Sequence, residues 1–207
     1  MKYPILFILS VLGLTLLVLS PRHVNAQTYT EATFNQSIPL FKDRYSYIEC
    51  GNIIPTESYT KEAWGYLDRK NGKSNNIMSG TVGTPSANAG HVLMIGSGNE
   101  YKLSAGHGGD WQTVIDDTEF PTRTWTHVAV SYNHTSGTMI LYKNGVEVNR
   151  STGAGSIEGH QELWLGSSDY ERTHFFEGKL DEVRLWNDVR SATEIRDHYA
   201  DVLTGNE

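Results

Sequence analysis

The sequence predicts an all-β protein, an antiparallel sandwich that ends in one short helix. Short segments that alternate polar and apolar residues follow one another along the chain, separated by frequent turn residues. The chain lacks the strand–helix alternation that builds a parallel sheet. A capping-box pattern from Ser191 to Glu194, followed by Ile195, Tyr199 and Val202 at helical spacing, predicts the helix.

The first 26 residues have the pattern of a secretory leader. Lys2 precedes an apolar run, Ile5–Leu19, and Val24–Ala26 offers small residues for cleavage. A membrane anchor is the alternative, but a span needs about 20 apolar residues and this run is shorter. We therefore expect cleavage, secretion to the extracellular space (or to the periplasm, if the host is bacterial), and one domain over residues 27–207.

The early part of the chain predicts three strands. Ser46–Cys50 alternates in polarity, Tyr59–Leu67 follows, and His91–Ile95 lies within a glycine-rich stretch. For Tyr59–Leu67 the pattern alone leaves open which face points inward. Cys50 is the only cysteine, so no intrachain disulfide can form, and we expect this residue to be small, apolar and buried.

The middle of the chain predicts three consecutive antiparallel strands. Trp125–Tyr132 is followed by a turn and then by Thr138–Lys143. Asn144-Gly145 suits a two-residue type I′ turn, because both central residues there need positive φ, and it leads into Val146–Val148.

The last predicted strands are Glu162–Gly166 and Phe175–Trp186. In the second of these, Asp181 has the same parity as Val183 and Leu185, which places a carboxylate on the face expected to be buried. A carboxylate there needs hydrogen-bond donors or a cation, because an isolated buried charge is very costly.

The strand Trp125–Tyr132, the hairpin Leu141–Gly145 and the strand Phe176–Trp186 together resemble the laminin-G-like jelly roll. The resemblance is closest to the LamG-like and pentraxin branches of the concanavalin A-like lectin/glucanase superfamily. It extends over roughly residues 31–203, nearly all of the chain after the leader. It implies a two-sheet jelly roll that is often secreted, often binds glycans or proteins, and often holds calcium.

The resemblance implies Asp181 as a candidate calcium ligand, with Asp169 as a companion. Asp169 is the one residue of Ser167–Asp169 whose chemistry matches the acidic and amide cluster of pentraxins. Calcium prefers six to eight oxygen ligands, so a single carboxylate cannot form a site. The alternative role for Asp181 is to accept backbone N–H bonds from an adjacent loop.

The candidate ligand-binding residues are His107, Asp110 and Trp111, with Tyr170 as a further one. An exposed Trp can stack on a sugar ring while a nearby Asp or His exchanges hydrogen bonds with hydroxyl groups; a Trp that covers the core beside a loop is the alternative. The acidic group of Asp116, Asp117 and Glu119 is expected to be a solvated loop, and His127 is expected to have a structural role.

The net charge and the motifs of the sequence narrow the classes of function that we expect. The net charge is −7, and loss of the leader with Lys2 and Arg22 makes it more negative, which disfavours nucleic acid and anionic membranes as partners. No paired-carboxylate glucanase pattern, nucleophile elbow or phosphate loop occurs. We expect a secreted, non-catalytic carbohydrate-binding module; a protein-interaction or adhesion module is the alternative, and a glycosidase or polysaccharide lyase is the least favoured.

Overall fold

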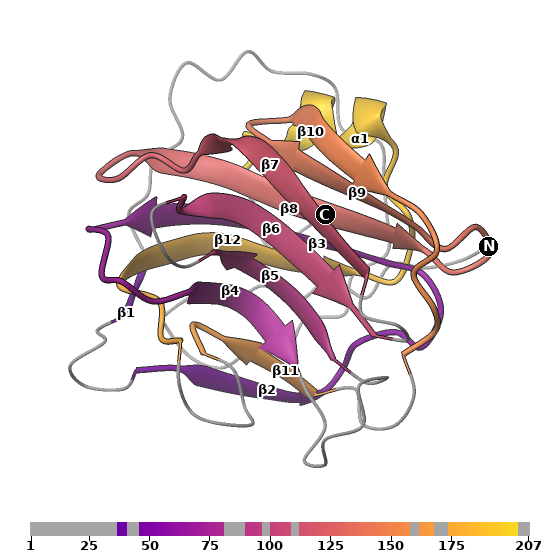
Figure 1. Ribbon diagram of the computed structural model, residues 1–207, viewed down its shortest axis with the longest axis horizontal. Helices are drawn as coiled ribbons and strands as arrows, with labels where there is room; N and C mark the ends of the chain where they lie inside the picture. Colours follow the sequence, from indigo (N-terminus) through magenta and orange to yellow (C-terminus); the bar gives the residue numbers. More distant parts are fainter. Residues whose placement is uncertain are drawn as a thin grey trace.

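The chain folds into two antiparallel sheets that pack face to face (Figure 1). This computed structural model describes residues 37–40, 46–80, 90–96, 100–108, 112–157, 162–167 and 174–202. Within them lie twelve strands and one short helix, which confirms the predicted all-β sandwich with a C-terminal helix. The predicted leader lies outside the described residues, and no helix of the described part is long and apolar enough to cross a bilayer.

Each sheet contains six strands. In spatial order, sheet A consists of β1 (Ile38–Leu40), β12 (Gly178–Trp186), β3 (Tyr59–Leu67), β8 (Trp125–Asn133), β9 (Thr138–Lys143) and β10 (Val146–Ser151). Sheet B consists of β2 (Ile48–Asn52), β11 (Glu162–Leu165), β4 (Asn75–Gly80), β5 (His91–Ile95), β6 (Lys102–His107) and β7 (Gln112–Glu119). The predicted β8–β9–β10 order is confirmed, and Asn144 and Gly145 both have positive φ, at 49° and 76°.

The strands that sequence reasoning missed are mainly β4, β6 and β7. Their residues are amides, glycines and acids that disfavour strands on their own. Pairing with neighbours on both sides holds β4 and β6 in place, so tertiary context overrides local preference.

The core lies between the two sheets. Leu67 and Val130 of sheet A and Leu93 and Leu103 of sheet B are fully or almost fully buried there. Cys50 is half-buried against the same core, and burial raises the pKa of its thiol to about 11, so the prediction of a packed rather than a reactive cysteine agrees with its surroundings.

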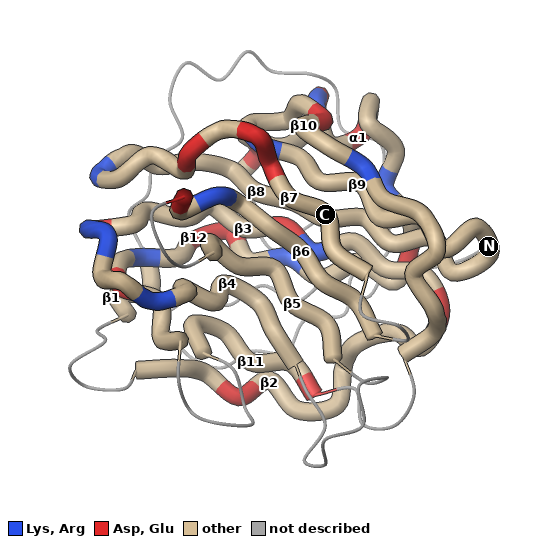
Figure 2. Tube along the Cα trace, viewed as in Figure 1, with Lys and Arg blue, Asp and Glu red and all other residues tan. Residues whose placement is uncertain are grey.

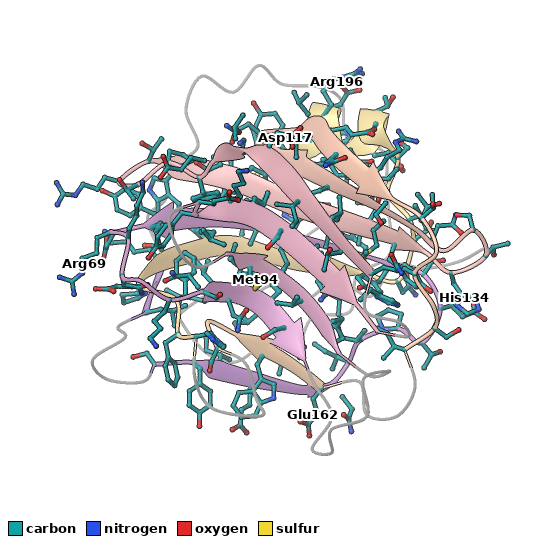
Figure 3. The ribbon with its side chains drawn as sticks, viewed as in Figure 1. Arg69, Met94, Asp117, His134, Glu162 and Arg196 are labelled. Atoms are coloured by element: carbon teal, nitrogen blue, oxygen red, sulfur yellow. The ribbon has the colours of Figure 1, made fainter. Side chains whose placement is uncertain are left out.

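The sandwich has two ends that matter for the functional residues. At one, which we call the His107 end, β6 finishes at His107 and β7 begins at Gln112. At the other, the Leu165 end, β11 finishes at Leu165 and β12 begins at Gly178. Figure 3 shows the two ends on opposite sides of the molecule, with His134 near the first and Arg69 near the second.

A β-bulge in β12 overturns the predicted placement of Asp181. The pairing with β3 shifts between Asp181 and Arg184, and Glu182 takes a positive φ of 46°. The extra residue reverses the side-chain parity, so Leu180 and Val183 both face the core. Asp181 instead pairs with Trp64, on the outer face of sheet A.

The helix α1 (Ala192–His198) covers part of this outer face. The predicted capping box is confirmed: Ser191 Oγ accepts a hydrogen bond from the Glu194 backbone N–H, and the Glu194 carboxylate accepts one from the Ser191 N–H. Ile195 is fully buried against Ala129 and Tyr142. The helix is thereby anchored across β8 and β9.

A charged network fixes the rest of the C-terminal segment to the sheet. The carboxylate of Glu62, which is 0% exposed, lies 2.6 Å from the Arg190 guanidinium and 3.2 Å from His127 Nε2. Burial alone would raise the pKa of Glu62, but the His127 and Arg190 interactions lower it to about 2. Arg184, also buried, donates to the backbone oxygens of His198 and Asp201.

A second polar cluster lies inside the sandwich at the His107 end. Lys61 is 0% exposed, and its Nζ is 2.5 Å from His91 Nδ1. His91 pairs directly with His107, whose Nδ1 is 2.8 Å from the Tyr59 hydroxyl and whose ring stacks on Tyr132. Burial lowers the pKa of Lys61 and His91 well below their usual values, and that of His107 to about 3.

The cluster predicts a protein that gains stability towards alkaline pH. The folded pKa values of Lys61, His91 and His107 are lowered, so the unfolded chain binds more protons, and the free energy of unfolding rises with pH. The two histidines contribute to this pH dependence below about pH 6.5, and Lys61 contributes to it up to about pH 10.4. Each group contributes at most about 1.4 kcal/mol per pH unit. Urea unfolding at pH 5, 7 and 9 measures the slope.

In Lys61→Met we expect the slope between pH 7 and 9 to flatten, while the slope between pH 5 and 7 persists because His91 and His107 are unchanged. Tyr59 and Tyr132, the other titratable groups of the cluster, are neutral over this range because burial raises the pKa of both. Equal alkaline slopes in the two proteins would contradict a lowered Lys61 pKa.

The network at Glu62 predicts a large loss of stability in Glu62→Gln. Removing the carboxylate leaves Arg190, whose side chain is only 10% exposed, without its paired charge, so the free energy of unfolding should fall by about 3 kcal/mol. Glu147→Gln is the matched control, because Glu147 pairs with Arg150 at the surface and its loss should cost less than about 1 kcal/mol. Similar losses in both variants would show that the Glu62 network is not stabilising.

Candidate functional site

The outer face of sheet B carries two straight rows of side chains that cross the strands. Directly paired residues on neighbouring strands point to the same side of a sheet, so the register defines each row. From β2 to β7 the first row contains Glu49, Trp164, Ser79, Val92, Gly106 and Thr113. From β4 to β7 the second contains Asn76, Met94, Ser104 and Ile115.

Two polar atoms in the second row lack a hydrogen-bond partner. Asn76 Oδ1 and Ser104 Oγ are inaccessible to solvent, in residues 3% and 6% exposed, and neither bonds to another part of the described chain. They lie on either side of Met94, which Figure 3 shows near the middle of this face. Buried polar groups in folded proteins are normally hydrogen-bonded, so the described residues leave these two atoms without the partner that such groups usually have.

The middle of the face is uncharged. Figure 2 shows the central parts of β4, β5 and β6 without acidic or basic residues. Lys102 and Glu162 stand at strand ends, on the rim of the sheet. Ser79 and Gly106 have a small side chain or none, so they project little from the sheet. Ile115, at the β7 side of the face, is 45% exposed. The face therefore suits an uncharged, hydroxyl-bearing ligand better than an anion.

Aromatic rings border the face on the side of β2 and β11. Tyr47 stacks on Trp164 with ring centroids 4.8 Å apart and planes inclined by 24°. Phe175 lies beside Tyr47, with centroids 6.3 Å apart. These rings give the uncharged floor an apolar wall against which the C–H face of a sugar could pack.

Four of the predicted site residues, Asp110, Trp111, Asp169 and Tyr170, lie outside the described residues. Both segments that contain them adjoin sheet B. The first follows β6 at the His107 end, and the second follows Ser167, whose carbonyl oxygen accepts a hydrogen bond from Ser79 Oγ.

His107, the remaining predicted ligand residue, points inward. It is fully buried, with its ring against Tyr132 and the Tyr59 hydroxyl, and burial lowers its pKa to about 3. In this position it supports the β6–β7 turn from inside the sandwich and does not face solvent.

Asp181, the predicted metal ligand, lies on the opposite sheet from the Ser167 segment that precedes Asp169. Its Oδ1 accepts a hydrogen bond from the Glu182 N–H at 2.9 Å, and partial burial raises its pKa. No group of three or more His, Cys, Asp or Glu side chains in the described ranges could hold a metal ion. Asp181 thus accepts a backbone N–H bond, but from its own neighbour Glu182 and not from an adjacent loop.

The acidic group from Asp116 to Glu119 belongs to β7, so the expectation of a solvated loop is wrong. Asp116 has the parity of buried Val114 and is itself buried at the sheet edge. Its carboxylate accepts hydrogen bonds from Thr118 and from Lys143 of β9, which lower its pKa against the effect of burial. This compensation lets an acid occupy an inward position. His127, expected to be structural, is buried beside Glu62.

Sequence reasoning missed Asn76, Met94 and Ser104. No local motif marks them, because their juxtaposition depends on the register of β4, β5 and β6 and on the bulge between Asn76 and Met78. Only the short apolar run around Met94 gave a signal, and it identified the strand but not its outer face.

Comparison with solved structures finds the same architecture in several glycan-related domains. Domain 4 of AbnA, a GH43 extracellular arabinanase from Geobacillus stearothermophilus solved with arabinotriose, aligns with a TM-score of 0.59 and 19% identity, over 78% of this chain and 70% of that one. The CBM40 of the Ruminococcus gnavus IT-sialidase, bound to α2,3-sialyllactose, gives 0.60 and 18%, over 69% and 82%. At these identities the likeness establishes the fold alone.

A Limulus polyphemus SAP-like pentraxin also aligns, with a TM-score of 0.59 and 14% identity, over 80% of this chain and 77% of that one. A search of curated proteins found no matching relative. The Laminin_G_3 family, described as the concanavalin A-like lectin/glucanases superfamily, matches residues 42–196, which include both sheets from β2 onward and the start of α1. The chain therefore belongs to the Laminin_G_3 family of the concanavalin A-like lectin/glucanase superfamily.

Proposed function

We propose that this chain is a non-catalytic carbohydrate-binding module that holds an oligosaccharide on the outer face of sheet B. The observation that carries the proposal is the pair of unpartnered polar atoms, Asn76 Oδ1 and Ser104 Oγ, in the uncharged middle of this face. A sugar supplies both kinds of contact such a face needs. Its hydroxyl groups bond to the two polar side chains, and its C–H surface packs on Met94 and the Trp164 side.

Two related folds support glycan as the ligand class. The arabinanase domain was solved with arabinotriose and the sialidase CBM40 with sialyllactose. The first ligand is neutral and the second anionic. The uncharged rows of sheet B favour the neutral class for this chain, since an anionic sugar needs a cation or several N–H donors.

The two described rows contain no pair of carboxylates between Trp164 and Ile115, which supports a binding role rather than hydrolysis. Glycosidases commonly place two carboxyl groups about 5–9.5 Å apart across the scissile bond. Between Trp164 and Ile115 neither described row contains an acid. The proposal also includes export, which the leader-like residues 1–26 support.

Blocking the floor of sheet B should weaken glycan binding. Ser104→Trp removes a polar contact and fills the space beside Met94, and we expect the dissociation constant of the best ligand on a neutral glycan array to rise about tenfold or more. Ile115→Trp is a second block at an exposed position of the same row, where it cannot disturb the core.

Val146→Trp is the matched control. Val146 is exposed at the β9–β10 turn of sheet A and belongs to neither row, so binding should stay at the wild-type level. Wild-type affinity in both Ser104→Trp and Ile115→Trp would overturn the proposed site. A wild-type protein that binds no glycan would overturn the function and favour a protein-interaction module.

For Asp181 we propose the hydrogen-bonding role rather than calcium ligation. A ligand of the native state raises the melting temperature by mass action. We therefore expect millimolar CaCl₂ and EDTA to give melting temperatures within about 1 °C of each other, with MgCl₂ as the ionic-strength control. A calcium-specific rise of several degrees would restore Asp181 and Asp169 as candidate ligands.

A further inference from the structure

The outer face of sheet A has an aromatic surface beyond the helix. Lys179, Tyr66 and Trp125 form one cross-strand row at the Leu165 end, over β12, β3 and β8. The next row contains Asp181 and Trp64. We call these five residues the aromatic shelf. Because strands lie about 4.8 Å apart, the first row is about 10 Å long.

The rings of the shelf are partly exposed and close together. Tyr66 and Trp125 have centroids 5.5 Å apart with planes inclined by 56°. The exposed Lys179 ammonium lies 5.4 Å from the centre of the Tyr66 ring. Trp64 stands behind them, where its Nε1 donates to the Tyr199 carbonyl oxygen at 3.0 Å. The C-terminal segment thus lies against Trp64 on one side of the shelf.

The β12 bulge puts a carboxylate next to these rings. Asp181 faces outward with Trp64. Its Oδ1 accepts a hydrogen bond from the Glu182 N–H. Lys179 and Asp181 sit two residues apart on one strand and point to the same side, so about 6.6 Å of strand separates a cationic donor from an anionic acceptor. Neighbouring Glu182 pairs with Arg184 and adds little net charge.

We infer that the aromatic shelf is a second carbohydrate-binding site, on the opposite sheet from the first. Tyr66 and Trp125 pack on the C–H faces of an oligosaccharide, Asp181 accepts from its hydroxyl groups, and Lys179 donates to its oxygens. Alternating charges beside two rings suit such a ligand better than a protein partner, whose anchor would need a desolvated apolar patch without charges at its centre. A module with both sites can bridge two glycan chains.

The inference shares its ligand class with the proposed function but uses separate residues, so variants separate the two. Affinity electrophoresis through gels that contain arabinan, xylan or mixed-linkage β-glucan provides the probes. We expect Ser104→Trp to retain part of the wild-type retardation by at least one polysaccharide. In that background, Trp125→Ala should raise the apparent dissociation constant about tenfold, whereas Trp125→Phe, which keeps a ring, should retain most of the binding.

Each other outcome has a definite meaning. Residual binding of Ser104→Trp that is unchanged by Trp125→Ala overturns the second site, and so does complete loss of binding in Ser104→Trp alone. Binding that depends on Trp125 but not on Ser104 supports the shelf and overturns the sheet B proposal. No retardation of the wild type by any polysaccharide overturns both. Thermal unfolding of each variant, with Val146→Trp as the folded control, excludes loss through misfolding.

Discussion

The apolar layer between the two sheets is the constraint on which the rest of the molecule depends. With Cys50 as its only cysteine, the chain cannot form an intrachain disulfide, so burial of residues such as Leu93 and Val130 must hold the sheets together. Each strand that contributes an inward row automatically presents an outward row, since side chains alternate. The core thus determines which residues can form the two outer faces, and a change of register would exchange them.

The two outer faces of the sandwich differ in what covers them. Sheet A is covered over β8 and β9 by α1, which the Glu62–Arg190 pair and Ile195 fix in place, and the aromatic shelf lies at the Leu165 end, over which no described helix passes. Sheet B has no described helix across it and presents small and uncharged side chains around Met94. This asymmetry explains why we assign the primary glycan contact to sheet B, and why a second contact on sheet A is confined to one end.

Much of the fold could be predicted from the sequence, because short sequence patterns indicate the local backbone geometry. The Asn144-Gly145 turn and the Ser191–Glu194 capping box each require a specific backbone geometry, and both form as expected. Asp181 shows where such reasoning stops. The side-chain alternation predicted for Asp181 holds for a regular strand. The bulge at Glu182 forms through pairing with β3, so no local sequence pattern indicates it. The site at Asn76 and Ser104 is likewise a product of long-range register, whereas Trp111 and Tyr170 remain predictions from composition.

The central claim is that a glycan lies across the rows of sheet B. Hydrogen–deuterium exchange with and without the oligosaccharide that binds best on a glycan array tests it directly, because it reports on each strand separately. A ligand on this face should slow amide exchange in the β4, β5 and β6 segments and in the adjoining turns, with a smaller effect confined to the ends of β3, β8 and β12. Unchanged exchange throughout sheet B at saturating ligand would contradict the account.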